Sequence, residues 1–336
     1  NGKNAYAQVF ESTRGMRIGD PVTFEGHMLE VTLGPGMLSK NYDGLQNDLD
    51  KMDGVFLKRG SYTYALDEEK LWDFKPLATV GDRVTAGAWL GEVEENFQSI
   101  KVMVPFTFEG IYTLKSLQPA GKYTVEDNIA VLVDESGVEH PITMKQKWPV
   151  KRPITCYADK PRPHKLLETG VRMIDTMNPI VEGGTGFIPG PFGTGKTVLQ
   201  HAISKQAEAD IVIIAACGER ANEVVEVFKE FPELLDPNTG RPLMERTIII
   251  ANTSNMPVAA REASVYTAMT IAEYYRSMGL KVLLMADSTS RWAQALREMS
   301  NRLEELPGPD AFPMDLSAIV ANFYARAGFV HLKNGQ

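Results

Sequence analysis

One segment constrains this chain more than any other: residues 190–197 read Gly-Pro-Phe-Gly-Thr-Gly-Lys-Thr, which matches the pattern G-x-x-x-x-G-K-[ST]. The apolar residues 186–189 before it predict a strand, and residues 197–208 after it predict a helix. Glycines let the backbone curl until successive N–H groups point at phosphate oxygens, and the helix N-terminus adds partial positive charge. The alternative is a glycine-rich turn with a solvated lysine, but the full match with both flanks favours a phosphate-binding loop.

The loop residues have expected tasks at a nucleotide. Lys196 would reach the terminal phosphates, and the Thr197 hydroxyl would ligate Mg²⁺. The expected nucleotide-binding residues are Gly190, Pro191, Phe192, Gly193, Thr194, Gly195, Lys196, Thr197 and Val198.

From about residue 165 onward, apolar strand patterns alternate with helical patterns, which predicts a mostly parallel sheet covered by helices. The expected strands are 211–216, 247–251 and 282–286, and the expected helices are 221–230, 257–278 and 290–304. This part of the chain is therefore expected to be α/β.

Residues 1 to about 150 have a different pattern, with short β-rich runs between glycine and proline turn signals. The expected strands include 5–10, 21–24, 100–104 and 129–133. We expect an all-β portion with a barrel-like core of its own. A proline-rich segment, 141–165, is the expected linker to the α/β part, because prolines cannot donate to a sheet ladder.

Residues 79–93 and 100–105 resemble the swinging-arm domains that bear biotin or lipoate on a lysine. Those domains present the lysine on an exposed tight hairpin, whereas Lys101 lies within the apolar run Ile-Lys-Val-Met-Val-Pro. The resemblance therefore favours a structural barrel-sandwich over a carrier.

Composition excludes several classes of protein. A chain of 336 residues is long enough for roughly two domains of about 150 residues each, and no apolar run of about 18 residues is present that could span a bilayer. The net charge of −8 argues against general nucleic-acid or anionic-lipid affinity, so large partners are expected to be proteins. Two distant cysteines, Cys156 and Cys217, give no support for a disulfide framework or a zinc site and favour a reducing, cytosolic compartment.

A magnesium site needs a second oxygen ligand, and residues 282–287 end in an acid after an apolar strand. Asp287 would then lie at the carboxyl edge of the sheet beside the phosphate loop. The alternative is that Asp287 caps the following helix, a task that Ser288 or Ser290 could also perform. Asp210 stands at the start of a strand, so we expect it at the opposite edge.

Residues 211–220 end in Gly-Glu-Arg, which places Glu219 and Arg220 over the same edge. Glu219 is the expected positioner of an attacking water and Arg220 its relay or partner, with a surface salt bridge as the alternative. Arg291 could face the terminal phosphate, or it could instead pair with glutamates in 298–305. Arg261 is left outside the expected site.

These segments occur together in one known family. The stretches GPFGTGKT, CGERANEV, ANTSNMPVAAREAS, IAEYYR and MADSTSRWAQALRE closely resemble the catalytic A subunit of V-type and archaeal-type rotary ATPases. Two stretches near the β-rich part, LGPGMLSKNYDGLQ and VKRPITCYADKPRPHKLLETG, also look like that subunit, so the resemblance extends over the whole chain. It implies the same phosphate, magnesium, water-positioning and relay tasks for Lys196, Thr197, Glu219, Arg220, Asp287 and Arg291.

The resemblance implies a RecA-like P-loop core that binds ATP or ADP with Mg²⁺ and couples its hydrolysis or synthesis to H⁺ or Na⁺ transport. It implies B subunits in the same ring as donors of an arginine finger, and central and peripheral stalk subunits as further partners. The subunit would lie on the cytoplasmic face and meet the membrane only indirectly. Such subunits in eukaryotes have a cysteine where this chain has Thr194, so a bacterial or archaeal source is expected.

The resemblance also predicts the domain organisation of what we expect to be a piece of a longer protein. Residues 1–50 would be a remnant of an N-terminal barrel and connector, and 51–140 a β-rich bulge inserted before the core. The linker would span 141–165 and the nucleotide-binding domain 166–336.

The sequence also leaves open functions other than that of a rotary ATPase A subunit. Other ring ATPases with the same core would lack the bulge: the F-type β subunit, the flagellar or type III export ATPase, and the termination factor Rho. A non-catalytic B subunit would not need an intact Lys196, Thr197 and Glu219. A biotin or lipoate carrier would show a mass increment on Lys101.

Overall fold

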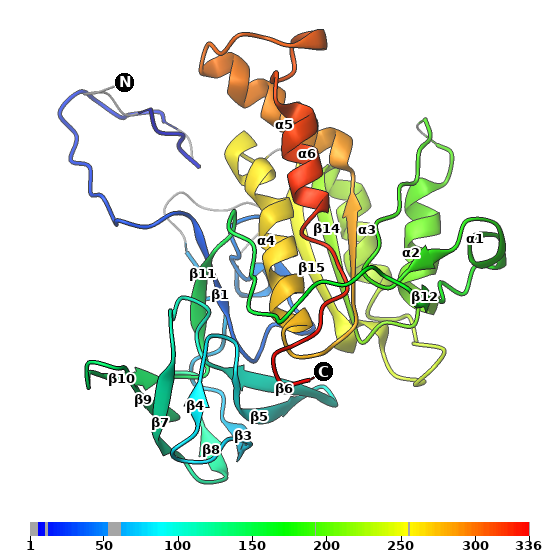
Figure 1. Cartoon of the computed structure of the whole chain (residues 1–336). Helices are drawn as coiled ribbons and strands as arrows, with labels where there is room; N and C mark the ends of the chain where they lie inside the picture. The colour runs from blue at the N-terminus through cyan, green and yellow to red at the C-terminus, as the bar shows by residue number, and fades with distance from the viewer. Residues whose placement is uncertain (1–5, 11–12, 53–61, 192, 255, 336) are drawn as a thin grey trace.

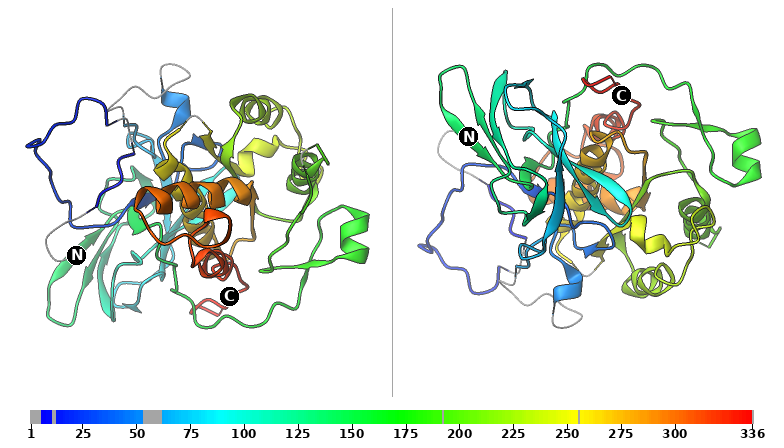
Figure 2. Two further views of the ribbon diagram at one scale, coloured as in Figure 1. Left: turned by 90° about the horizontal axis from the view of Figure 1, so that it is seen from above. Right: turned by 90° about the horizontal axis from the view of Figure 1, so that it is seen from below.

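The computed structural model describes residues 6–10, 13–52, 62–191, 193–254 and 256–335. A β-rich part, coloured cyan to teal, lies beside an α/β part that contains the later half of the chain (Figure 1). Figure 2 shows the same two parts from above and below. Within the described residues, no helix combines the length and apolar character needed to cross a membrane.

The α/β part is built on a parallel sheet with strand order β16-β14-β15-β2. Its strands are β2 (Asn41–Tyr42), β14 (Ile211–Glu219), β15 (Thr247–Thr253) and β16 (Val282–Asp287). Its helices are α1 (Arg172–Met177), α2 (Lys196–Gln206), α3 (Ala221–Glu230), α4 (Val258–Arg276), α5 (Thr289–Arg302) and α6 (Leu316–Tyr324). The expected alternation of strands and helices is confirmed.

Burial explains why these strands are apolar throughout. In β14 every residue except the last is buried, as a parallel strand covered on both faces requires. One face packs on α4, which is itself buried along most of its length, and Ile213 and Ala268 belong to that cluster. The other face packs on α3, where Ile214 meets Val224 and Phe231 in a second cluster.

The β-rich part consists mainly of two antiparallel four-stranded sheets, with orders β10-β9-β7-β4 and β6-β5-β3-β8. Its strands are β3 (Trp72–Pro76), β4 (Arg83–Val84), β5 (Trp89–Glu95), β6 (Gln98–Met103), β7 (Tyr112–Leu117), β8 (Gly121–Tyr123), β9 (Ala130–Val133) and β10 (Glu139–Ile142). Remaining short elements are β1 (Glu30–Leu33), β11 (Gln146–Pro149), β12 (Leu166–Leu167), β13 (Ile180–Val181) and the 3-10 turns η1 (Leu49–Lys51), η2 (Leu243–Arg246) and η3 (Pro309–Ala311).

The expectation of a separate core in the β-rich part is only half right. A cluster around Leu90, Leu114 and Leu132 lies wholly within it. A second set of its buried side chains, including Phe74, is continuous with the cluster under α4 that contains Tyr274. The β5–β6 hairpin also bonds to the α/β part, because Trp89 Nε1 donates to the Ser277 carbonyl at 3.1 Å and Asn96 Nδ2 donates to that of Glu245 at 2.9 Å. The two parts therefore share a core.

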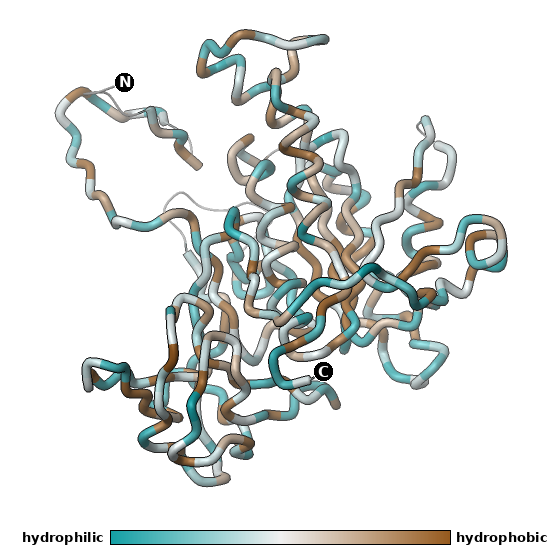
Figure 3. Tube along the Cα trace, in the orientation of Figure 1, coloured by the Kyte–Doolittle hydropathy of each residue, from teal (hydrophilic) through white to brown (hydrophobic). Residues whose placement is uncertain are grey.

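Two strands expected near the N-terminus are wrong within the described residues. Residues 6–10 and 21–24 form no strand, and Phe24 is 84% exposed. The segment runs as an arm away from the rest of the chain, with apolar residues recurring along it (Figures 1 and 3). A strand needs a partner for its backbone hydrogen bonds, and local sequence alone does not supply one.

The expected linker 141–165 begins too early. Pro141 lies in β10, an edge strand where a missing backbone donor is tolerated, and Pro149 ends β11, which pairs with β1. Beyond residue 149 the chain makes a turn at 150–152 and then has neither helix nor strand, apart from an isolated bridge between Asp159 and His331, until β12 begins.

Candidate functional site

The phosphate loop ends where α2 begins. Gly195 is the N-cap of α2 with φ 81°, and Gly193 has φ 80°. Both values lie in the left-handed region that glycine adopts without a steric penalty, so this turn requires glycine at these positions. The first backbone N–H groups of α2 have no side-chain cap, as expected for a helix end that receives an anion. Phe192 lies outside the described residues.

The strand expected at 186–189 is absent. These residues are extended without ladder bonds, and Phe187 is 77% exposed. Pro189 has no N–H to donate, and the preceding strand β13 pairs with β12 rather than with a strand of the parallel sheet. The phosphate loop is therefore followed by the expected helix α2. The segment before it does not join the described parallel sheet, in which β16 is the edge strand.

The Lys196 side chain folds over the loop. Its Nζ donates to the carbonyl of Gly190 at 2.8 Å and to that of Pro191 at 2.7 Å. The ammonium therefore points into the turn, where phosphate oxygens could replace these carbonyl acceptors. Thr194 Oγ1 also donates to the Pro191 carbonyl, at 2.8 Å, and the side chain of Val198 is exposed.

Thr197 and Asp287 meet across the sheet edge, 90 residues apart in sequence. Thr197 Oγ1 on α2 donates to Asp287 Oδ2 at the end of β16, at 2.7 Å. A hydroxyl and a carboxylate oxygen side by side are the hard donors that Mg²⁺ takes together with substrate phosphates, so these residues fit the metal. The helix-cap interpretation of Asp287 is wrong, because Ser288 is the N-cap of α5 and no side chain caps that helix.

Glu219 ends β14 beside this pair, since Ala216 is in register with Asp287 on β16. The pKa of Glu219 is raised to about 7, mainly by burial and also by a hydrogen bond with Glu223 and the charge of Asp287, whereas the charge of Arg291 lowers it. A carboxyl with a pKa near neutrality at a sheet edge is suited to positioning and deprotonating a water.

The three arginines near Glu219 in the fold or the sequence, Arg291, Arg261 and Arg220, differ in their interactions. Arg291 acts on Glu219 electrostatically, and among the described residues the ion pair to Glu298 belongs to Arg261 at 3.7 Å, not to Arg291. Arg220 is the N-cap of α3, directly after Glu219. The competing expectation of an Arg291 pair with this glutamate is therefore not met.

The expected position of Asp210 at the opposite edge of the sheet is confirmed. Asp210 lies before the first residue of β14, at the opposite edge, and accepts a hydrogen bond from the Lys281 backbone N–H at 2.8 Å.

Lys101 is part of the β-rich sheet and not of an exposed turn. It lies within β6, and its Nζ donates to Glu92 Oε2 at 2.5 Å and to Ser99 Oγ at 2.8 Å. The ammonium also lies 5.1 Å from the centre of the Trp89 ring. A lysine held in this way is unsuited to carry a swinging cofactor.

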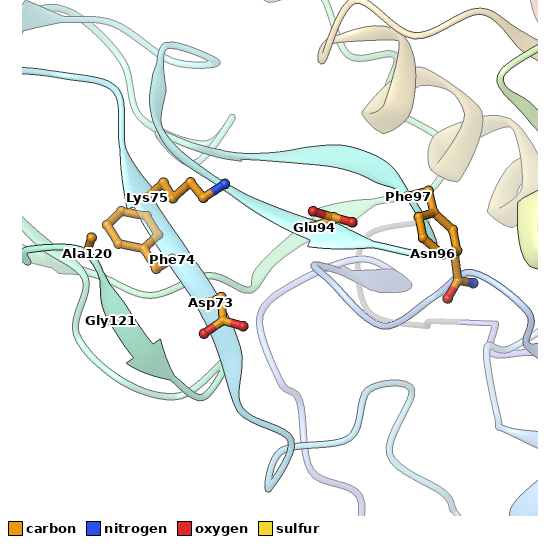
Figure 4. Close-up of a pocket in the computed structure, with 8 residues that line it drawn as sticks. All are labelled: Asp73, Phe74, Lys75, Glu94, Asn96, Phe97, Ala120 and Gly121. Carbon is orange, nitrogen blue, oxygen red and sulfur yellow. The ribbon is translucent and has the colours of Figure 1, made fainter.

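Two cavities lie outside the phosphate loop. One of about 740 Å³ opens between β3 and β5 of the β-rich part, where Asp73 and Glu94 flank it (Figure 4). The other, of about 400 Å³, lies between the residues that precede the loop and helices α5 and α6, beside Phe187 and Trp292. Neither of these two cavities is lined by Lys196, Asp287 or Glu219.

Two family models match parts of this chain. Residues 170–336 match the ATP synthase alpha/beta family, nucleotide-binding domain, and residues 63–151 match the barrel-sandwich domain of the ATP synthase alpha/beta subunit. The V-type ATP synthase alpha chain of Treponema denticola is 59% identical over 99% of this chain and 57% of that protein. Alpha chains of Borrelia recurrentis (58% identical, 98% of this chain, 58% of that protein) and Treponema pallidum (56%, 100%, 57%) are similarly close.

The chain thus spans a little over half the length of these curated relatives. A solved ATPase of a bacterial type III secretion system aligns with 59% of this chain and 54% of its own at 29% identity, with a TM-score of 0.45.

Sequence reasoning missed two residues at the site. Glu223 lies on the first turn of α3, four residues after Glu219, and helical spacing alone could have indicated its proximity. Arg261 lies against the Gly218 backbone, which only the packing of α4 on β14 reveals.

Proposed function

The chain belongs to the ATP synthase alpha/beta family, and we propose that it forms the nucleotide-binding portion of a rotary ATPase catalytic subunit that hydrolyses or synthesises ATP. The main support is the hydrogen bond between Thr197 and Asp287, because it joins the phosphate loop to the carboxyl edge where Glu219 ends its strand. A phosphate-binding lysine, a metal-ligating pair and a carboxyl of raised pKa then share one edge of one sheet.

Each side chain has a distinct task in this proposal. Lys196 exchanges the carbonyls of Gly190 and Pro191 for phosphate oxygens when a nucleotide binds. Thr197 and Asp287 would hold Mg²⁺, which when bound neutralises charge on the phosphates. The loop N–H groups and the start of α2 bind the remaining phosphate oxygens.

Glu219 orients the attacking water and accepts its proton. Its pKa of about 7 means that the carboxylate form is available at neutral pH while basicity is retained. The positive charge of Arg291 favours that ionised form.

The whole protein would work within a larger assembly. We propose that B subunits alternate with it in a ring and donate an arginine finger, that stalk subunits convey rotation, and that the ring lies on the cytoplasmic face of a membrane. The transported cation would be H⁺ or Na⁺. The alpha-chain names of the spirochaete relatives support this placement.

The other functions considered are less well supported. The ion pair and sheet position of Lys101 oppose the carrier. The presence of Lys196, Thr197 and Glu219 in one site opposes a non-catalytic subunit. The other ring ATPases would lack the inserted β-rich domain, whereas residues 63–151 of this chain match a barrel-sandwich domain. The named relatives are V-type alpha chains.

The test is phosphate release by the assembled complex of the full-length subunit. Lys196→Ala removes the only side-chain cation that bonds to the loop carbonyls in the described structure, so nucleotide affinity and turnover should both be lost. Lys205→Ala, in the last turn of the same helix, is the matched control and should retain both. Near-normal turnover in Lys196→Ala would contradict the proposed function.

A further inference from the structure

The strand that ends in Glu219 contains an irregularity just before that residue. The pairing of β14 with β15 shifts register between Cys217 and Glu219, and Gly218 has φ 75° in the left-handed region. Such a bulge changes the direction of the residue that follows it. The orientation of the Glu219 side chain therefore depends on what keeps this bulge in place.

Arg261 lies directly against the bulge. A Cβ atom added to Gly218 would lie 2.8 Å from Arg261 Cδ and 3.1 Å from its Nε, so the glycine backbone rests on the arginine side chain. Arg261 is only 8% exposed, and its Nε is buried with no hydrogen-bond partner among the described residues. A buried charged side chain in this position is costly unless its other groups are well bonded.

The two terminal nitrogens of the Arg261 guanidinium connect it to neighbouring elements. Its Nη2 donates to the Ser254 carbonyl at 3.2 Å, and its Nη1 lies 3.7 Å from Glu298 Oε1 on α5. The Ser254 N–H in turn donates to the Glu219 carbonyl at 3.0 Å. A continuous path of contacts thus joins α5, α4 and the end of β15 to the peptide of Glu219.

We propose that Arg261 is a positioning residue for Glu219, acting through the Gly218 bulge and the Ser254 peptide. This inference rests on the proposed function of Glu219. The contacts of Arg261 are with the backbone on either side of the Glu219 peptide, so we assign its action to the position of the carboxyl rather than to its ionisation. The planar fork of an arginine bonds in two directions at once, and a lysine cannot reproduce that arrangement.

The consequence is a specific kinetic pattern in the full-length enzyme complex. Arg261→Met should lower kcat by about tenfold or more, the scale expected when a reacting group is misplaced by about 1 Å. The KM for ATP and the affinity for ADP should change by less than about threefold, because the guanidinium of Arg261 bonds to Ser254 and pairs with Glu298 rather than with residues of the phosphate loop that the structure describes. Arg261→Lys should lose less, and it provides a second variant if the methionine variant assembles poorly.

A double-mutant cycle with Glu219→Gln separates this role from a general effect on folding. If Arg261 acts through Glu219, then Arg261→Met should reduce the residual turnover of Glu219→Gln by less than about twofold. Arg276→Met is the matched control, since Arg276 is a half-buried arginine on the same helix whose Nη1 donates to the Arg326 carbonyl at 2.9 Å, far from the Gly218 bulge in the chain. It should lower Tm but leave kcat per assembled complex within about twofold of the parent.

The inference would be overturned if Arg261→Met lowered kcat by the same factor in the parent and in Glu219→Gln. It would also be overturned if Arg276→Met lowered kcat as much as Arg261→Met does. A tenfold loss of ADP affinity in Arg261→Met would instead place this arginine at the nucleotide and also overturn it. The proposed function fails by a different result, namely turnover that survives Lys196→Ala.

Discussion

The raised pKa of Glu219 predicts how turnover should depend on pH. With a pKa of about 7, Glu219 is mostly protonated at pH 6 and mostly ionised at pH 8. If its carboxylate accepts the proton of the attacking water, kcat/KM should rise about tenfold between about pH 6 and about pH 8, following the ionised fraction of the free enzyme. The assay is phosphate release by the full complex at saturating and at low ATP.

Two neighbouring substitutions should move this profile in opposite directions. Glu223 raises the pKa of Glu219, so Glu223→Gln should shift the acid limb to lower pH. Arg291 lowers that pKa, so Arg291→Gln should shift the limb to higher pH, in addition to any loss in rate. Glu219→Gln should abolish the limb and reduce turnover by about 10² or more while nucleotide binding survives.

The same pKa has a consequence for stability that can be measured separately. The ordinary pKa of a glutamate is 4.5. Between this pH and about pH 7, the folded protein therefore retains a proton on Glu219 that the unfolded chain releases. Stability contributed by this group therefore falls as pH rises through that window. Glu219→Gln should consequently be more stable than the parent at pH 8 and not at pH 4. An unchanged pH profile in Glu223→Gln and Arg291→Gln, with turnover unaltered in Glu219→Gln, would refute the reasoning.

Further predictions concern the proposed magnesium ligand Asp287, the β-bulge at Gly218, and the buried core that the β-rich and α/β parts share. Asp287→Asn should weaken the dependence of turnover on magnesium while ATP remains bound through Lys196, and an unaltered magnesium titration would contradict the metal role. Gly218→Ala places a Cβ 2.8 Å from Arg261 Cδ at a φ of 75°, so kcat should fall with little change in KM; parent kinetics would show that the bulge tolerates a side chain. Gly91→Ala places a Cβ 2.2 Å from the buried Phe74 ring and should destabilise the protein by about 1–3 kcal/mol in chemical denaturation, whereas an unchanged midpoint would contradict the packing. Glu273→Gln removes the carboxylate 2.5 Å from the buried Arg326 Nε and should cost about 3–5 kcal/mol, and a loss below about 1 kcal/mol would show that the pair is not needed.

Much of the α/β part could be predicted from sequence because its signals are local. Strands such as β14 are apolar in every buried position, and helices such as α3 begin at the residue where the pattern indicates. Asp287 and Glu219 were placed at one edge because parallel strands bring their carboxyl ends together. At that edge Asp287 accepts a hydrogen bond from Thr197.

The misplaced elements depend on long-range pairing. Residues 21–24 have strand-like composition but no partner in the described chain, and residues 186–189 precede the loop without joining the sheet. The common core of the two parts is equally invisible to local patterns, because Phe74 on β3 and Tyr274 on α4 are distant in sequence yet belong to one buried cluster. Arg261 was missed for the same reason, since its role depends on which strand its helix covers.

The central claim is that residues 190–198, Asp287 and Glu219 together form an ATP site. A crystal structure of the full-length subunit with magnesium and a non-hydrolysable ATP analogue tests it most directly. We expect Lys196 Nζ to leave the carbonyls of Gly190 and Pro191 for phosphate oxygens, and the metal to lie between Thr197 and Asp287 with Glu219 facing the terminal phosphate. Nucleotide bound elsewhere, or phosphates bound without contact to Lys196 and Thr197, would contradict the account.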